Sequence, residues 1–243
     1  MLTRVYIDNY KCFVNFEFNP RPLQLILGLN GAGKSSLIEV LSLLRRFVFD
    51  GDPTTALFDP RTLTRWQSLV VQAFELDVEG NGGRYRYRLE VEHDVAHKQC
   101  RAKKESLSFD QKPLFESALG DGQLYRNDFT KGPPASFDWS RSGVGVLGAR
   151  PDNQKMSWFK QWIKRVFCLH PDPRNMPGRT DGEEAFPSQN LSNFASWYRH
   201  LVQEKPDAIH ALRTSLAQVI DCFDSLRPTS EGENVRVLRL TQK

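Results

Sequence analysis

"LILGLNGAGKSSLIEVLSLL" runs from Leu25 to Leu44 and decides how the start of the chain folds. The glycines, the lysine and the serine in it have the spacing G-x-x-x-x-G-K-[ST]. The run "PLQLILG" before the glycines predicts a short buried strand, because it is apolar and ends at a turn residue. A helix is predicted from about Lys34, because apolar residues recur on one face. That face holds Leu37, Leu41, Leu44 and Val48, widened by Ile38 and Val40.

The spacing of this loop predicts a phosphate-binding site. Glycines let successive N–H groups turn toward phosphate oxygens, and the helix beside them adds its partial positive end. We expect Lys34 to reach the β- and γ-phosphates and the Ser35 hydroxyl to ligate Mg²⁺. The spacing does not fit the dinucleotide fingerprint G-x-G-x-x-G, because Leu29 and Asn30 separate the first two glycines. The candidate nucleotide-binding residues are Gly28, Leu29, Asn30, Gly31, Ala32, Gly33, Lys34, Ser35 and Ser36.

The composition is that of a globular protein with a mild positive charge. The chain has 243 residues, 40% of them hydrophobic, which is enough for a substantial core. Lys plus Arg number 33 against 29 Asp plus Glu, so contact with nucleic acid is permitted but not required. The sequence shows no signal peptide and no apolar run of membrane-spanning length, so a cytoplasmic protein with no membrane partner is expected. Its four cysteines are far apart and predict reduced thiols.

The order of the predicted elements indicates an α/β protein in three parts. Residues 1–130 are predicted to hold the loop and a β-rich subdomain, in which "GNGG" at Gly80–Gly83 joins two strands. Residues 131–154 are rich in Gly, Pro, Ser and Arg and predict a loop or linker. Residues 155–243 predict mainly helices, with a pair separated at Pro206 and a last strand at "NVRVLRL".

The segment "IDNYKCFVNFEF…PLQLILGLNGAGKSSLIEVLSLL" resembles the N-terminal lobe of the RecF-like, SMC-related ABC-type ATPases, a group often labelled AAA-family ATPases. In these proteins a short strand and an N-F/Y-[KR]-x-F segment precede the Walker A loop. Asn9, Tyr10, Lys11 and Phe13 fill those places. The resemblance implies a P-loop NTPase N-terminal lobe with an antiparallel β-subdomain, followed by a helical segment that leads to a second half of the ATPase.

Hydrolysis in this group also needs a Walker B strand and a signature loop. No four apolar residues lead into Asp-Glu anywhere in the chain. "LGDGQ" (Leu119–Gln123) is similar to the L-S-D-G-Q signature but lacks its serine, and "LYRND" follows where a helix should begin. We therefore predict a turn between strands there. The chain is expected to be the first half of an ATPase, as a gene fragment, a subunit of a split protein or a truncated piece, and inactive or very slow by itself.

Several further residues are weaker candidates. Lys11 matches a basic residue that approaches the nucleotide in relatives, and a surface lysine is the alternative. The resemblance implies a glutamine that senses Mg²⁺ and the attacking water; Gln67 and Gln72 lie in the region expected for it, and Gln72 is preferred. "EHDVAHKQC" offers His93, His97 and Cys100 as metal ligands, but a solvated turn is favoured.

A basic stripe on one predicted strand could touch DNA. Arg84, Arg86 and Arg88 share one face, but Glu90 and Glu92 continue it. An ordinary solvated face is therefore favoured, because the acidic residues dilute the charge.

The resemblance implies binding of ATP and Mg²⁺, with a homodimer or a partner chain supplying the signature and Walker B residues. The alternatives are a non-hydrolysing nucleotide-binding regulatory subunit and a small-molecule kinase. The β-rich insertion after the first helix argues against the kinase. Relatives act in DNA repair and in defence against phage, and nothing in the sequence selects between these processes.

Overall fold

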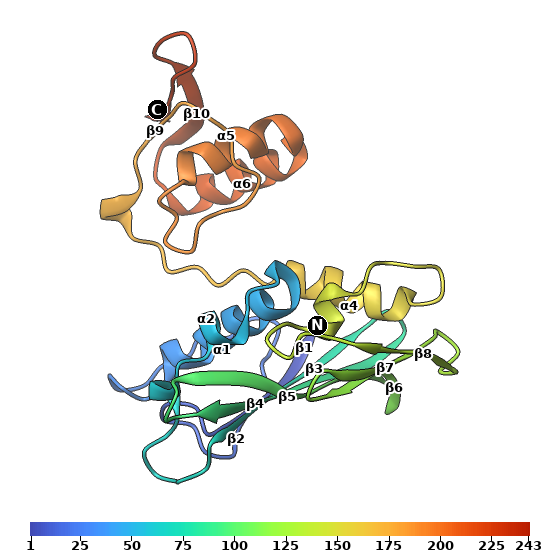
Figure 1. Cartoon of the computed structure of the whole chain (residues 1–243). Coiled ribbons are helices and arrows are strands. Elements are labelled where there is room, and N and C mark those ends of the chain that lie inside the picture. Colours follow the sequence, from blue (N-terminus) through green and yellow to red (C-terminus); the bar gives the residue numbers. More distant parts are fainter. The chain divides into compact units, whose positions relative to one another are not determined.

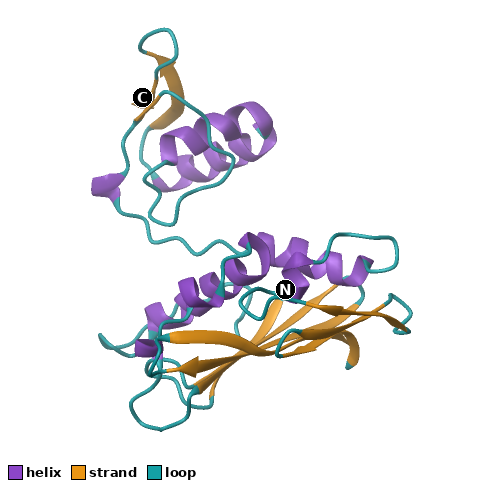
Figure 2. Cartoon of the chain, in the orientation of Figure 1, coloured by secondary structure: helices purple, strands orange, loops and turns teal.

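The computed structural model describes residues 1–243, which divide into two compact units, Met1–Val166 and Phe167–Lys243. The first unit is a sheet of eight strands with helices over one face (Figures 1 and 2). Its strand order is β2-β1-β3-β4-β5-β6-β7-β8, and every neighbouring pair is antiparallel. The strands are β1 (Leu2–Asp8), β2 (Phe16–Phe18), β3 (Val71–Gly80), β4 (Gly83–Asp94), β5 (Gln99–Phe109), β6 (Lys112–Ala118), β7 (Asp121–Tyr125) and β8 (Lys131–Ser136).

Helical segments of the first unit cover the inner face of the sheet (Figure 1). They are α1 (Lys34–Arg45), η1 (Arg46–Asp50), α2 (Thr54–Leu57), η2 (Pro60–Thr62), α3 (Gly143–Val146) and α4 (Gln154–Lys164). The predicted stripe of α1 is confirmed, since Leu37 and Leu44 are buried and η1 continues the helix to bury Val48. On the same face, Phe159 of α4 stacks on Tyr87 of β4, with ring centroids 5.5 Å apart. The two helices therefore share one core with the sheet.

The second unit holds a small sheet and a helix pair. Its elements are η3 (Pro173–Asn175), β9 (Arg179–Thr180), α5 (Phe194–Glu204), α6 (Pro206–Val219), β10 (Phe223–Ser230) and β11 (Arg236–Gln242). The sheet has the order β10-β11-β9. The predicted break between two helices is confirmed, because Pro206 is the first residue of α6, where a missing N–H is tolerated. None of the helices combines the length and the apolar character that a membrane span requires.

The predicted turn at "GNGG" is confirmed. Gly80 pairs with Gly83, and the two residues between them have positive φ, 53° at Asn81 and 79° at Gly82. Two positive φ angles define the turn type that matches the twist of a hairpin. The β3–β4 hairpin is therefore set by its turn residues.

Two stretches differ from what the sequence predicts. The run before the loop is not a buried strand: it has no strand partner, and Leu23, Leu25 and Leu27 are 94%, 79% and 80% exposed. An apolar run indicates only that burial would be favourable, and no strand of this chain lies beside it to provide that burial. The range 131–154, for which the composition predicts a loop or linker, contains β8 and α3. β8 carries two prolines, which are tolerated because it is the edge strand.

Candidate functional site

The glycine-rich loop Gly28–Ser36 leads directly into α1. Gly31 and Gly33 have φ angles of 82° and 92°, a left-handed conformation that other residues rarely adopt. Gly33 is the residue before the helix, and no side chain caps the first turn, which also lacks an acidic residue. The N–H groups of that turn are thus unsatisfied within the protein, and the helix end carries partial positive charge. This is the arrangement of an anion-binding site.

Lys34 closes this loop on itself. Its Nζ donates to the backbone oxygens of Gly28 and Leu29, both at 2.7 Å. These carbonyls are neutral acceptors, whereas a phosphate oxygen carries a negative charge that attracts the ammonium by Coulomb interaction as well. A phosphate held by the loop would therefore draw the ammonium toward itself. Ser35, next along the helix, is exposed.

The segment Tyr10–Phe13 packs against the loop and brings Lys11 to α1. Tyr10 and Phe13 exchange two backbone hydrogen bonds, which close a tight turn. Cys12 and Phe13 lie so near Gly33 that a side chain there would collide with both. Lys11 forms an ion pair with Glu39 of α1. The structure therefore packs this segment against the loop and holds Lys11 at Glu39, beyond the first turn of α1. The contact of Cys12 with Gly33 and the pairing of Glu39 with Lys11 have no signal in the sequence.

Gln72 is a residue of β3, and its side chain belongs to a buried polar network rather than to the glycine-rich loop. Its Nε2 donates to the backbone oxygen of Asn9 at 3.1 Å and to Thr62 Oγ1 at 3.0 Å. Its Oε1 lies 3.0 Å from His93 Nε2. The side chain is fully buried and its amide is occupied at both ends. A contact between Gln72 and Mg²⁺ stays a prediction, and it would require this network to break. Gln67 is half-buried, and its Nε2 has no partner.

"LGDGQ" is a turn, as predicted. It joins β6 to β7, with Ala118 paired to Asp121. Leu119 and Gly120 between them have φ angles of 51° and 91°. A strand follows this turn, whereas a signature loop is followed by a helix.

The "EHDVAHKQC" stretch spans the turn between β4 and β5. His93 and Cys100 face each other on these strands, while His97 pairs with Asp94. Cys100 Sγ donates to the backbone oxygen of Phe58 at 3.2 Å, and burial raises the pKa of this thiol. The structure contains no group of three or more His, Cys, Asp or Glu residues that could hold a metal. Cys12, Cys100 and Cys222 are free thiols.

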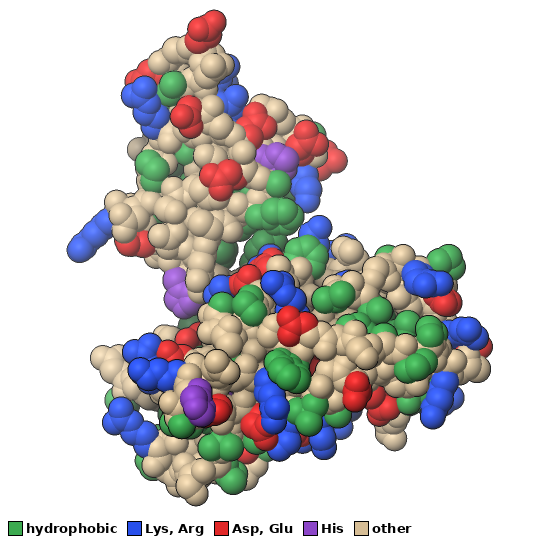
Figure 3. All heavy atoms as spheres, in the orientation of Figure 1, with side chains coloured by type: hydrophobic (Ala, Val, Ile, Leu, Met, Phe, Trp, Pro, Cys, Tyr) green, Lys and Arg blue, Asp and Glu red, His purple; other side chains and the backbone are tan.

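The arginine stripe lies on the open face of the sheet and is paired with acidic residues. Arg84 and Arg86 both donate to Asp77, which is buried, and Arg88 pairs with Glu75 and Glu90. Burial of Asp77 opposes its ionisation, but hydrogen bonds from Arg86 and Arg84 outweigh this and lower its pKa. Figure 3 shows basic and acidic side chains interspersed over the visible surface. The face is close to neutral, as the acidic residues in the sequence indicate.

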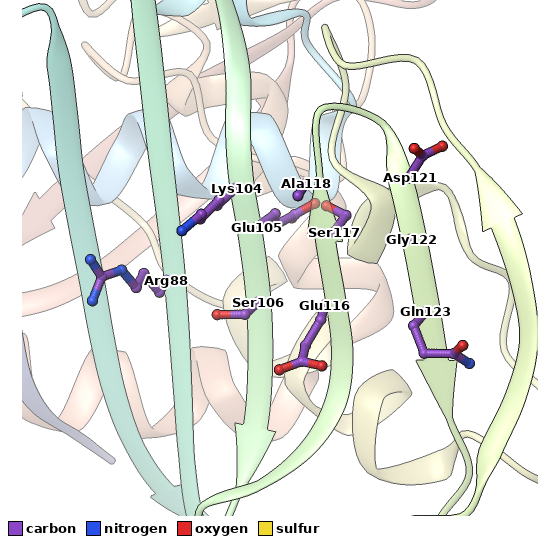
Figure 4. A pocket seen from close by; sticks show the side chains of 10 residues that line it. All are labelled: Arg88, Lys104, Glu105, Ser106, Glu116, Ser117, Ala118, Asp121, Gly122 and Gln123. Carbon is purple, nitrogen blue, oxygen red and sulfur yellow. The ribbon is translucent and has the colours of Figure 1, made fainter.

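A hollow of about 530 Å³ lies on this open face (Figure 4). Two rows of residues that pair across neighbouring strands cross this hollow. One row is Arg88, Ser106 and Glu116, and the other is Lys104 and Ala118. The small side chains of Ser106 and Ala118 leave the space, with basic groups on one wall and acidic groups on the other. No residue of the glycine-rich loop lines it. This hollow is therefore separate from the anion-binding helix end.

One comparison with known proteins identifies the family. A family model described as "AAA domain" matches residues 4–133, more than half of the chain, and this range includes the glycine-rich loop. The chain belongs to the AAA domain family. This membership indicates nucleotide binding and an ATPase-type function. No curated protein matches the chain.

Proposed function

We propose that the loop Gly28–Ser36 is a Walker A loop that binds ATP with Mg²⁺. The observation that carries this proposal is the uncapped start of α1 behind two left-handed glycines, with Lys34 already inside the loop. The first-turn N–H groups would hold the β-phosphate, Lys34 would contact the β- and γ-phosphates, and the exposed Ser35 hydroxyl would ligate Mg²⁺. Lys11 would lie near the phosphates only after leaving Glu39.

We further propose that the chain acts as the N-terminal part of a RecF/SMC-like ATPase and that hydrolysis needs groups from outside these 243 residues. The sequence supports this, because it holds no Walker B strand and its one signature-like stretch is a turn. A second copy or a partner chain would close over the γ-phosphate, so that bound ATP drives association. In-line attack by water would then be assisted by Lys34 and Mg²⁺ as they neutralise the developing charge. Such an enzyme would act in DNA repair or in defence against phage, and we propose a cytoplasmic location for it.

A titration of ATP binding tests the first proposal. Lys34→Ala removes the charged donor to the phosphates and should weaken ATP binding by roughly 10- to 100-fold. Lys131→Ala is the matched control, because Lys131 is an exposed lysine on the edge strand β8. Equal affinity of the wild type and Lys34→Ala would refute the assignment of the loop.

Turnover and association test the second proposal. The purified chain should bind ATP and release phosphate at a rate near background. Sedimentation with and without ATP-Mg²⁺ should reveal nucleotide-dependent association if a second copy completes the site. Robust turnover by the monomeric chain would show that no outside group is needed.

A further inference from the structure

The ion pair between Lys11 and Glu39 joins the turn Tyr10–Phe13 to the first half of α1. Glu39 is the single acidic residue of this helix. It follows Lys34, the first residue of α1, by about 7.5 Å along the helix axis at the usual rise per residue. The carboxylate therefore lies little more than one turn beyond the N–H groups at the start of the helix.

The backbone of Lys11 is fixed beside the glycine-rich loop. Its N–H donates to the backbone oxygen of Thr62 at 2.6 Å. The next residue, Cys12, has its Sγ 2.7 Å from the place where a Cβ on Gly33 would lie. Consecutive Cα atoms are about 3.8 Å apart, so Lys11 also starts close to the loop. Because a lysine ammonium stands on a flexible stem, it can turn from Glu39 to a phosphate without any movement of this backbone.

The contact between Lys11 and Glu39 can be broken at low cost. Both side chains are partly exposed, 38% for Lys11 and 40% for Glu39. Ion pairs at such positions contribute little to stability, because water screens both charges. The Lys11 ammonium also lies over the Tyr10 ring, 5.5 Å from its centroid. A nucleotide polyphosphate carries several negative charges where Glu39 carries one, so it would compete well for this ammonium.

Glu39 has a second neighbour that can take the place of Lys11. The hydroxyl of Tyr10 is buried and has no hydrogen-bond partner. Burial and the nearby negative charge of Glu39 raise the pKa of Tyr10, so the hydroxyl keeps its proton at neutral pH and can donate it. A buried donor without a partner costs free energy. A carboxylate released by Lys11 could accept from this hydroxyl and remove that cost.

We propose that Glu39 is a positioning residue that holds Lys11 away from the glycine-rich loop until a nucleotide binds. The polyphosphate would draw Lys11 from Glu39, and the released carboxylate would turn to the Tyr10 hydroxyl. The ion pair thus lowers the affinity of the loop for nucleotides, because each binding event has to break it. This inference rests on the proposed Walker A function of the loop.

A double-mutant cycle on ATP affinity tests this exchange, with ATP-Mg²⁺ titrated into the full chain and followed by calorimetry. Glu39→Gln releases Lys11 and should tighten ATP binding about 2- to 5-fold. In a Lys11→Ala background the same substitution should tighten binding less, because it then removes only the repulsion between the carboxylate and the phosphates. The gain should also shrink as salt is added. A purely structural role of Glu39 would not raise the affinity for a polyanion.

Asp52→Asn is the matched control. Asp52 pairs with Arg46 at similar exposure, 33% and 44%, but it follows the far end of the helical run that begins at the loop. Its substitution should leave ATP affinity unchanged, and a gain equal to that of Glu39→Gln would overturn the proposal. So would unchanged or weaker binding by Glu39→Gln, or an equal gain with and without Lys11. If ATP binding still depends on Lys34 in those cases, the Walker A assignment stands, whereas a wild-type chain that binds no ATP would refute both.

Discussion

Replacing Gly33 by alanine should disturb the glycine-rich loop far more than replacing Gly31. Both glycines have positive φ, so alanine at either position meets a left-handed conformation that costs about 1–2 kcal/mol. At Gly31 a new Cβ meets no atom within 4 Å. At Gly33 it would lie 2.7 Å from Cys12 Sγ and 2.9 Å from Phe13 Cζ. Phe13 is buried and stacks on Phe16 at 4.3 Å, so it cannot easily move away.

Overpacking of this kind costs about 1–3 kcal/mol. Gly33→Ala should therefore lower the free energy of unfolding by about 2–5 kcal/mol in total, against about 1–2 kcal/mol for Gly31→Ala. Urea unfolding of both variants measures the difference. Adding Cys12→Ala should recover part of the loss in Gly33→Ala and none in Gly31→Ala. If the two glycine variants are equally stable, the packing of Tyr10–Phe13 against the loop is wrong.

Three further predictions concern the sheet, the core and the thiols. Leu44→Ala should lower the free energy of unfolding by about 2–5 kcal/mol, because Leu44 is fully buried, whereas Leu25→Ala, at an exposed position, should change it by less than about 0.5 kcal/mol. Urea unfolding measures both values, and similar losses of stability in the two variants would contradict the exposure of the run before the loop. Asp77 has a lowered pKa in the folded chain, so the unfolded chain binds its proton first as the pH falls. The stability that Asp77 contributes is present above its unfolded pKa of about 3.9 and is lost as the pH falls through the folded pKa. Acid unfolding of Asp77→Asn should therefore show a shallower pH dependence than wild type, with Glu79→Gln, an exposed neighbour, as control. Cys222 is exposed and should react rapidly with a thiol reagent, while buried Cys100, whose pKa is raised, should react only on unfolding; equal rates at the two thiols would count against this burial.

The parts of the fold that were predictable are those encoded by neighbouring residues. The stripe of α1, the turn at Asn81 and Gly82, and the turn at "LGDGQ" all follow from local periodicity and backbone preference. The spacing of the glycine-rich loop likewise lies within one short stretch, and family membership supports a nucleotide site.

The rest depends on which residues meet across the fold. The leucines before the loop have the composition of a buried strand, but burial needs a partner that the pattern does not specify. β8 was missed because its glycine and prolines are typical of loops, and only its place at the edge makes a strand possible. The partners of Gln72, which are Asn9, Thr62 and His93, come from three other segments, so no spacing rule could have found them.

The connectivity of the large sheet has a consequence for how the chain folds. From β3 to β8 each strand pairs with the next one along the sequence, so these hairpins close over short loops. β1 instead pairs with β3 across some seventy residues, with Val5 opposite Leu76, and α1 lies in the segment between them. Closing a long loop costs more entropy than closing a short one, and non-local pairing slows folding. We expect the β3–β8 meander to nucleate first and α1, the helix that follows the glycine-rich loop, to dock late in folding.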